Sequence, residues 1–270
     1  MYEAKDKVIL VTGGAAGLGA GIVRAFLDEG AKHVAALDVD VSQGEALEKE
    51  LTTKYGVNKI KFHKCDVTSK DLDDAYDKVK EEFAYIDIVV NCAGIMNDKP
   101  NVFMKEIEVN VSALIKSSLK AYELMRKDRG GKGGTVINIS SIVGLFQAQL
   151  LPVYAATKSA VLQFSNCLGM EPHYSRSGVR VLTICFGCTK TSLFSDTKMG
   201  TIDEETSQIL EIGLKKLPFQ KPESAVAGLI HAFKNGASAS TWLVTSDREA
   251  EDVTANVTKA YEIMSQGVYS

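Results

Sequence analysis

The fold is decided by a stretch near the start of the 270-residue chain, Val8-Ile9-Leu10-Val11-Thr12-Gly13-Gly14-Ala15-Ala16-Gly17-Leu18-Gly19. Four aliphatic residues run into glycines, and the apolar pattern that follows has a helical period. A strand that ends in a glycine-rich turn and opens a helix points free N–H groups and the positive end of the helix dipole at a pyrophosphate. The glycines allow the tight turn and the close approach of backbone to phosphate. An ordinary strand–helix turn is the alternative, and later residues decide between the two.

The choice of dinucleotide depends on the end of the next expected strand, residues 33–38. This strand ends at Asp38, about twenty residues beyond the glycines. An acidic residue there accepts hydrogen bonds from the adenosine ribose hydroxyls and repels a 2′-phosphate. Neither the glycine loop nor positions 39–41 carry an Arg or Lys that would neutralise such a phosphate. The sequence therefore predicts NAD rather than NADP as the cofactor.

A second informative stretch, Tyr154-Ala155-Ala156-Thr157-Lys158, begins thirteen residues after Ser141. On a helix, Tyr154 and Lys158 lie on one face because they are four residues apart. An ammonium held close to a phenol favours the phenolate, so Lys158 is expected to lower the pKa of Tyr154. Such a Tyr exchanges a proton with an alcohol or carbonyl oxygen near neutral pH. The two stretches together predict a redox enzyme that transfers a hydride and a proton.

These motifs in combination resemble the short-chain dehydrogenase/reductase family. The resemblance runs in order from about Lys7 to Trp242 and rests on Thr12-Gly13-x-x-x-Gly17-x-Gly19, Asn91-Cys92-Ala93-Gly94, Asn110, Ser141, Tyr154 and Lys158. Within the family, the insect alcohol dehydrogenase type and the NAD-dependent 15-hydroxyprostaglandin dehydrogenase type look nearest. The resemblance implies an NAD-dependent enzyme that interconverts an alcohol and its ketone.

The resemblance also implies a role for each of four catalytic residues. Tyr154 exchanges the proton, Lys158 assists it and binds the nicotinamide ribose, and Ser141 orients the substrate oxygen. Ser140 is the neighbouring rival, but the family spacing to Tyr154 selects Ser141. Asn110 matches an Asn that holds a water in a proton relay; a buried Asn bonded to backbone is the alternative for a helical Asn.

Cofactor contacts are implied at Gly13, Gly17, Leu18, Gly19, Asp38, Asp66, Val67, Asn91, Ala93, Gly94, Tyr154, Lys158, Gly187, Thr189 and Thr191. Asp66 matches the family acid near the adenine ring, and it would also serve as a cap for the next helix. The chain departs from the family pattern at Cys92, where a second Asn is commoner, and at Phe186, where Pro is usual. Phe186 removes a fixed φ from that loop.

Substrate contacts are expected from Ser141, Phe146, Leu151, Tyr154, Phe186 and Phe194. This lining favours an apolar secondary alcohol or ketone over a sugar or an acid. The alternative within enzymes is an NAD-dependent hydroxyprostaglandin or hydroxysteroid dehydrogenase. Leu151 counts against a prostaglandin, because the prostaglandin enzyme has a Gln there. The alternative outside enzymes is a dinucleotide-binding sensor or scaffold, whose usual signature is loss of the Tyr or the Lys.

Composition indicates one domain over residues 1–270. The resemblance implies a dinucleotide-binding half up to about 140, a catalytic and substrate half from about 141, and a lid at about 191–222. A net charge of −3 gives no reason to expect nucleic acid or an anionic membrane as partner. With five cysteines and no apolar signal segment at the start, a cytoplasmic location is expected.

Cys185-x-x-Cys188 leaves a redox function open. The four histidines are scattered, so no metal is expected.

The alternation of strand-like and helical patterns predicts an α/β fold: a doubly wound, Rossmann-type parallel sheet of about seven strands with helices on both faces. Strands are expected at 8–12, 33–38, 59–65, 86–91, 134–140, 179–185 and 240–245. Helices are expected at 17–30, 42–55, 69–84, 102–128, 153–176, 204–215, 222–235 and 248–265.

Assembly is expected from the two helices at 102–128 and 153–176, which carry more apolar residues than one sheet face can cover. These residues are Val111, Leu114, Ile115, Leu119, Tyr122, Val161, Phe164, Cys167, Leu168 and Met170. Two-fold pairing of the helices predicts a homodimer or a homotetramer. In the alternative, a monomer, the helix at 248–265 folds back over these residues.

Overall fold

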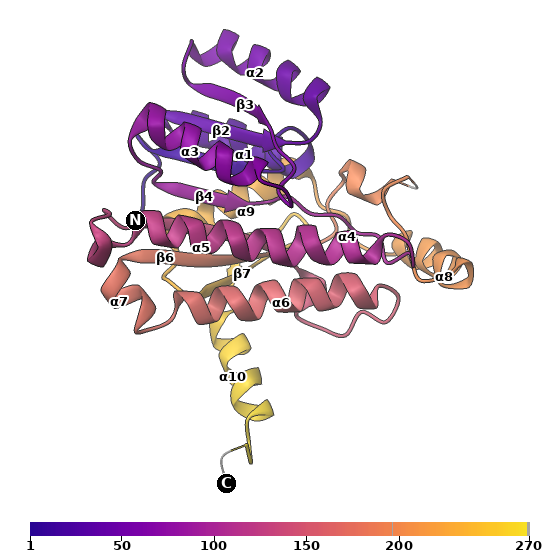
Figure 1. Ribbon diagram of the computed structural model, residues 1–270. Coiled ribbons are helices and arrows are strands. Elements are labelled where there is room, and N and C mark those ends of the chain that lie inside the picture. The colour runs from indigo at the N-terminus through magenta and orange to yellow at the C-terminus, as the bar shows by residue number, and fades with distance from the viewer. Residues whose placement is uncertain (196, 269–270) are drawn as a thin grey trace.

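An eight-stranded sheet forms the centre of the protein, in the order β3-β2-β1-β4-β5-β6-β7-β8 (Figure 1). The structure is a computed structural model and describes residues 1–195 and 197–268. The parallel strands are β1 (Val8–Thr12), β2 (His33–Asp38), β3 (Ile60–Lys64), β4 (Ile88–Asn91), β5 (Gly134–Ser141), β6 (Val179–Phe186) and β7 (Ser240–Val244). The predicted Rossmann-type sheet is confirmed. A short antiparallel strand, β8 (Glu251–Asp252), extends it at one edge and was not predicted.

Helices cover both faces of the sheet. One face packs against α1 (Gly17–Asp28), α2 (Val41–Tyr55) and α9 (Pro222–Asn235). The other packs against α3 (Asp71–Phe83), α5 (Leu114–Met125) and α6 (Pro152–Gly169). In Figure 1, α5 and α6 lie side by side in front of β6 and β7, while α9 lies behind.

The alternation of side chains along β1 divides the interior into two cores. Ile9 and Val11 belong to the core beneath α1, whereas Val8 and Leu10 belong to the core beneath α3 and α5. Successive residues of a strand point to opposite faces, so a strand covered on both sides is apolar throughout. This is why the central strands read as continuous aliphatic runs in the sequence.

The long helix expected at 102–128 is interrupted. It consists of α4 (Phe103–Ile107), a π-helical turn (Glu108–Ala113) and α5. Asn110 lies in the π-helical turn, and its side chain bonds both backbone groups of Ile95. A π-helical turn is a common device at functional sites, because it shifts side chains out of the regular helical repeat.

The helix expected at 153–176 ends early, at Gly169, and a short helix α7 (His173–Ser177) follows. Pro172 lies between them; it has no N–H to donate and its ring obstructs a continuing helix. Gly169 also packs so tightly that a Cβ there would lie 2.6 Å from the backbone nitrogen of Ala239. The expectation of one continuous helix was therefore wrong.

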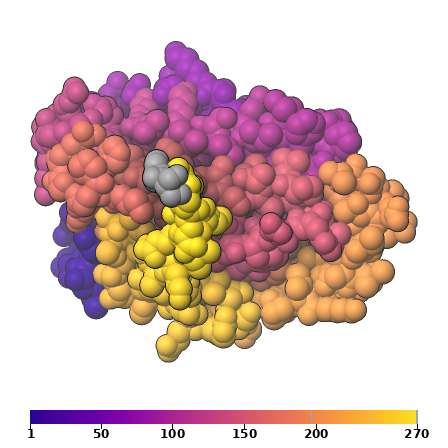
Figure 2. Space-filling view, turned by 90° about the horizontal axis from the view of Figure 1, so that it is seen from below, coloured from indigo at the N-terminus to yellow at the C-terminus, as the bar shows by residue number. Residues whose placement is uncertain are grey.

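The C-terminal helix α10 (Thr254–Met264) begins six residues later than expected, after β8. None of its residues is buried, and it projects from the body in Figure 1 and stands out beside α6 in Figure 2. The remaining elements are α8 (Glu204–Leu214) and 3₁₀ turns at Lys127–Arg129, Ile142–Gly144 and Ser192–Phe194. Within residues 1–195 and 197–268, no helix has both the length and the apolar character needed to cross a membrane.

Candidate active site

A cavity of about 1190 Å³ opens at the carboxyl edge of the sheet. Open α/β sheets bind their ligands at this edge. Its walls come from the glycine loop, the loop after β4, the end of β5, the start of α6, the segment after β6, and α8. Of the predicted site residues, all except Asn91 and Asn110 line this cavity.

The glycine loop has the geometry of an anion site. Gly17 has φ +51°, and a Cβ at Gly19 would lie 1.9 Å from the carbonyl oxygen of Gly13. No side chain caps the first turn of α1, and that turn contains no acidic residue. Its N–H groups are therefore free to bind the phosphates of a dinucleotide. The residues present fit the cofactor that the sequence predicts.

Asp38 lies at the end of β2 and is held by two backbone groups. Its carboxylate accepts hydrogen bonds from Ala15 N at 3.1 Å and from Asp40 N at 3.1 Å. One cation reaches this part of the cavity from a distant part of the chain: Lys198 lines the cavity, donates to Ser192 Oγ at 3.0 Å and acts electrostatically on Asp40. The local sequence around Asp38 gave no sign of this lysine.

Asp66 and Val67 line the cavity on the same side. Asp66 accepts hydrogen bonds from Thr68 N at 2.9 Å and from Lys105 Nζ at 3.3 Å. Its carboxylate makes no bond to the first turn of α3, whose capping position is Lys70. The carboxylate therefore holds the loop that borders the cavity, and the capping alternative is wrong.

The loop after β4 is fixed by a residue of the glycine motif. Thr12 Oγ1 accepts hydrogen bonds from Cys92 N at 3.1 Å and Ala93 N at 3.2 Å. Asn91 faces away from the cavity, where its amide donates to Ser118 Oγ and Asn138 Oδ1. Thus Asn91 supports the loop from within the core, while Ala93 and its neighbours form the wall.

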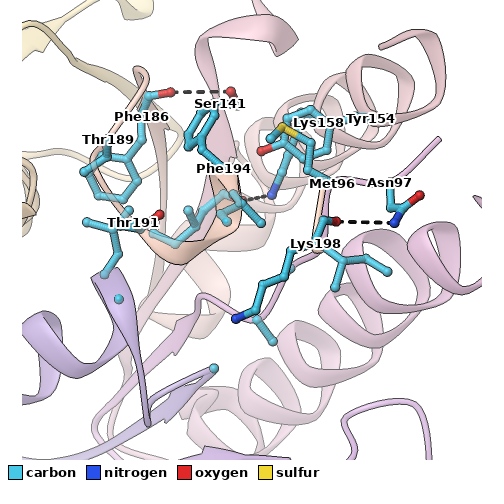
Figure 3. Close-up of a pocket in the computed structure, with 18 of the residues that line it drawn as sticks. Met96, Asn97, Ser141, Tyr154, Lys158, Phe186, Thr189, Thr191, Phe194 and Lys198 are labelled. Atoms are coloured by element: carbon cyan, nitrogen blue, oxygen red, sulfur yellow. Dashed lines mark hydrogen bonds between the residues drawn. The ribbon is translucent and has the colours of Figure 1, made fainter. Parts of the chain in front are cut away.

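Ser141, Tyr154 and Lys158 meet at the inner end of the cavity (Figure 3). Ser141 Oγ donates to the Phe186 carbonyl oxygen at 3.4 Å, and the Ser141 hydroxyl acts on Tyr154, whose pKa it lowers. Lys158 Nζ lies 5.6 Å from the centre of the Tyr154 ring. Ser140 instead donates to the Lys158 carbonyl at 2.8 Å, so it is the structural neighbour that the sequence predicts.

Burial governs the electrostatics of these groups. It raises the pKa of Tyr154 above its ordinary value, and the Ser141 hydroxyl only partly offsets this effect. This direction is opposite to the lowered Tyr154 pKa that the sequence predicts. Burial also lowers the pKa of Lys158 to about 8, and its ammonium donates to the Ile139 carbonyl at 3.0 Å.

Asn110 lies behind the catalytic residues and is fully buried. Its amide donates to the Ile95 carbonyl at 2.8 Å and to Thr157 Oγ1 at 3.1 Å, and its oxygen accepts from Ile95 N at 2.9 Å. This matches the alternative of a buried Asn bonded to backbone. The same bonds place the Ile95 loop next to α6.

The segment after β6 is anchored by a residue that the sequence did not reveal. Gln220 is fully buried and donates to Thr189 Oγ1 at 3.0 Å, and Thr189 in turn donates to the Gly187 carbonyl at 2.9 Å. A Gln preceding a helix carries no motif that would single it out. Burial raises the pKa of Cys185 to about 12, which argues against the redox interpretation of Cys185-x-x-Cys188 because the thiolate is the reactive form.

Apolar side chains form the outer part of the cavity. Leu151 is 7% exposed and packs with Met96, Tyr154 and Leu210 of α8, and Phe194 makes an edge contact with Phe219. Phe186 is buried beside Ser141, whereas Phe146 is 56% exposed at the rim. The apolar substrate-contact residues that the sequence predicts therefore converge on one cavity.

The sequence profile described as short chain dehydrogenase matches residues 7–200. The chain belongs to the short-chain dehydrogenase family. The resemblance inferred from the motifs is thus confirmed, and the protein is an oxidoreductase of a family that uses NAD or NADP.

Curated relatives agree with this membership. The chain is 35% identical over 240 residues to 15-hydroxyprostaglandin dehydrogenase [NAD(+)] of Rattus norvegicus, covering 87% of this chain and 89% of the relative. It is 36% identical over 183 residues to alcohol dehydrogenase 1 of Ceratitis cosyra, covering 66% and 70%. Both groups that looked nearest from the motifs are therefore represented.

Solved structures support the fold. A 3-ketoacyl-(acyl-carrier-protein) reductase from Brucella melitensis complexed with NADH matches with a TM-score of 0.75 at 21% sequence identity, covering 90% of this chain and 98% of that one. At this identity, the likeness establishes the α/β Rossmann-like architecture alone.

Proposed function

We propose that the protein transfers a hydride between NAD and an apolar secondary alcohol or its ketone. The observation that carries this proposal is the meeting of Ser141, Tyr154 and Lys158 at the inner end of an apolar cavity that begins at the glycine loop. The intact Tyr and Lys favour an enzyme over a dinucleotide-binding sensor or scaffold. The test is reduction of NAD by a panel of secondary alcohols, followed by the absorbance of the reduced nicotinamide.

NAD, when bound along the glycine loop, would supply the hydride acceptor. Ser141 orients the substrate oxygen, since its hydroxyl lines the cavity beside Tyr154 and acts on the Tyr154 phenol. As a phenolate, Tyr154 takes the hydroxyl proton in oxidation; as a phenol, it returns the proton in reduction. Lys158 is charged below about pH 8, and its ammonium favours the phenolate and binds the nicotinamide ribose. Asn110, which positions the Ile95 loop, supports the path by which the proton leaves.

The proposed substrate class rests on Leu151, Phe186 and Phe194, which give the cavity an apolar contact surface, although Gln147 and Gln149 also line it. A hydroxyprostaglandin is the second candidate, favoured by the 35% identity to the rat enzyme. Leu151 argues against it, because an aliphatic side chain cannot bond a second substrate hydroxyl. Measured kcat/KM values for a simple aliphatic alcohol, a hydroxysteroid and a hydroxyprostaglandin distinguish the candidates: the substrate with the highest value identifies the class.

We expect kcat/KM for NAD to exceed that for NADP by at least roughly tenfold, about 1.4 kcal/mol of discrimination. Asp38 repels a 2′-phosphate and needs hydroxyl donors. Steady-state kinetics with both cofactors measure the ratio, and Asp38→Asn should reduce it. Lys198→Ala is the matched control, because it removes the cation that would accommodate the 2′-phosphate of NADP and leaves Asp38 in place. Equal efficiencies in the wild type would contradict the assignment of Asp38.

The proposed organisation is one domain with a lid over the cavity. Residues 191–222 form the proposed lid, and α8 carries Leu210 into the cavity wall from this segment. The halves divide at about residue 140, where β5 delivers Ser141. The cysteines, all free, support a cytoplasmic location, since disulfides are rare there.

We expect the protein to form a homodimer through α5 and α6. Leu114, Tyr122, Val161 and Leu168 face the core, so the expected patch is smaller than the sequence implied. The patch retains half-buried or exposed side chains at Val111, Ile115, Leu119, Phe164, Cys167 and Met170. α10 projects from the body (Figure 1), although its Tyr261 interacts electrostatically with Cys167 at one end of this patch.

Light scattering should therefore give about twice the chain mass of 29.2 kDa, or four times if dimers pair further. Leu119→Glu should shift the mass to that of one chain, because it places a charge within the interface. Ile209→Glu, at a comparably exposed position on α8, is the control and should leave the mass unchanged. A wild-type mass near one chain at micromolar concentration would refute the dimer.

A further inference from the structure

Two carboxyl groups lie against each other beside the start of the catalytic helix. Asp98, in the loop after β4, is 2% exposed, and Glu106 of α4 is 0% exposed. Asn97, which precedes Asp98 in the chain, donates its N–H to Glu106 Oε1 at 3.1 Å, and Asp98 acts electrostatically on Glu106. Two buried carboxylates that interact in this way cannot both be ionised without a large electrostatic cost. The pair must therefore contain a proton.

The bonds of Asp98 identify it as the ionised member. Its Oδ2 accepts from Val153 N at 2.6 Å, and its Oδ1 accepts from Tyr154 N at 3.1 Å. These N–H groups belong to the first turn of α6, where a helix has no backbone partners of its own. An anion there is stabilised by both donors and by the helix dipole.

The bonds of Glu106 identify it as the protonated member. Its Oε1 accepts from Asn97 N at 3.1 Å, while its Oε2 is buried and accepts no hydrogen bond from any residue that the structure describes. If Oε2 carries the proton, it gains a hydrogen-bond partner, because it then donates to Asp98. Burial and the Asp98 charge together raise the pKa of Glu106 to about 8.

The other ionisable groups near the pair do not neutralise it. Lys158 of α6 acts electrostatically on Glu106, and Glu106 acts electrostatically on Tyr154 of the same helix. The Lys158 ammonium, however, donates to the Ile139 carbonyl and forms no ion pair with either carboxylate. Lys105, which neighbours Glu106 in α4, is directed to Asp66 and Thr68.

We propose that Asp98 and Glu106 share one proton and together fix the first turn of α6, which makes them positioning residues for Tyr154. The same loop also holds the proposed lid. Asp98 N donates to the Gly200 carbonyl at 2.9 Å, and Asn97 Nδ2 donates to the Lys198 carbonyl at 3.3 Å (Figure 3). One loop thus joins the catalytic helix to the segment that closes the cavity. The shared proton does not depend on the proposed function. Only the positioning role toward Tyr154 rests on the proposed function.

The shared proton predicts a pH effect on stability that Glu106→Gln removes. The pKa of Glu106 is raised above its ordinary value of 4.5, so the stability due to the protonated form is complete below that value and is lost as the pH rises through about 8. Between about pH 6.5 and about pH 9.5, the thermal midpoint of the wild type should fall by at least about 2 °C more than that of Glu106→Gln. Glu108→Gln, at an exposed position nearby, is the control and should behave like the wild type.

Infrared spectroscopy observes the proton directly. The wild type should show the carbonyl band of a buried protonated carboxyl group at neutral pH, and both Glu106→Gln and Asp98→Asn should lose it. No such band, or a band that persists in Glu106→Gln, would overturn the shared proton.

Kinetics test the positioning role. Asp98→Ala should lower kcat by about 10²-fold, the effect expected when a reacting group is misplaced by about 1 Å, with the cofactor Kd within about twofold of wild type. Asp98→Asn, which keeps a capping oxygen, should restore most of kcat although it removes the shared proton. Unchanged kcat in Asp98→Ala would overturn the positioning role. Tyr154→Phe separates this failure from failure of the proposed function: loss of turnover in Tyr154→Phe but not in Asp98→Ala means that the positioning role alone is wrong, whereas turnover retained in both means that the proposed function is wrong.

Discussion

The Tyr154→Phe variant should lose turnover by roughly 10²- to 10⁴-fold, the range of general acid–base assistance. The substitution removes one oxygen and with it the only proposed proton acceptor at the substrate oxygen. The ring stays in place, because Tyr154 is packed among Met96, Leu151 and Leu210. Cofactor affinity, measured by calorimetry, should stay within about twofold of wild type.

A matched control for this variant is Tyr76→Phe. Tyr76 is also a buried phenol, but it bonds Ser117, and neither residue lines the cavity. Its loss should reduce stability and leave kcat close to that of the wild type. Retention of half the wild-type turnover by Tyr154→Phe would show that another group transfers the proton.

The second large effect is expected for Gly19→Ala. An added Cβ would lie 1.9 Å from the Gly13 carbonyl oxygen and 3.1 Å from the Gly14 Cα. Backbone cannot move aside as a flexible side chain can, so the glycine loop must shift away from α1. A shift of this kind takes the loop N–H groups out of line with a diphosphate, and NAD affinity should fall by roughly 10²-fold or more, about 2.7 kcal/mol.

Gly213→Ala, in α8, controls for the general effect of adding a methyl group to a helical glycine. A Cβ at Gly213 meets nothing within 4 Å, and Ala stabilises a helix relative to Gly. This variant should bind NAD like the wild type, as measured by titration calorimetry. If Gly19→Ala also bound NAD normally, the assignment of the glycine loop to the cofactor would be wrong.

The sequence was sufficient for the sheet because its strands are covered on both faces. β1 and β4 consist largely of aliphatic residues and end at glycines or small residues, so their limits were predicted to within two residues. The two-residue β8 could not be predicted, since Glu251 and Asp252 have low strand propensity and pair only through their backbone with β7. Pro172 is a sequence signal for the end of α6, but the close packing of Gly169 against Ala239 is not, because these residues lie far apart in the chain.

The candidate site was predicted where a motif carries the chemistry, as at Ser141, Tyr154 and Lys158. It was missed where tertiary contacts give an ordinary residue its role. Glu106 belongs to a helix with Lys105 beside it and has the sequence context of a solvent-exposed acid, yet it is fully buried. Lys198 lines the cavity, and Gln220 anchors its wall through Thr189, both from a segment without motifs. The direction of the Tyr154 pKa could not be predicted either, because burial depends on the whole fold.

The π-helical turn at Glu108–Ala113 limits how this part of the chain tolerates insertion and deletion. The turn holds one residue more than the α-helical repeat would, because its hydrogen bonds join residues five apart. Removing a residue would return the turn to the α-helical repeat and displace Asn110 from Ile95 and from Thr157 of α6, although no side chain had been substituted. Chain length between α4 and α5 is therefore itself a constraint on the loop that Asn110 holds against the catalytic helix, and homologous sequences should vary in residue identity here far more readily than in residue number.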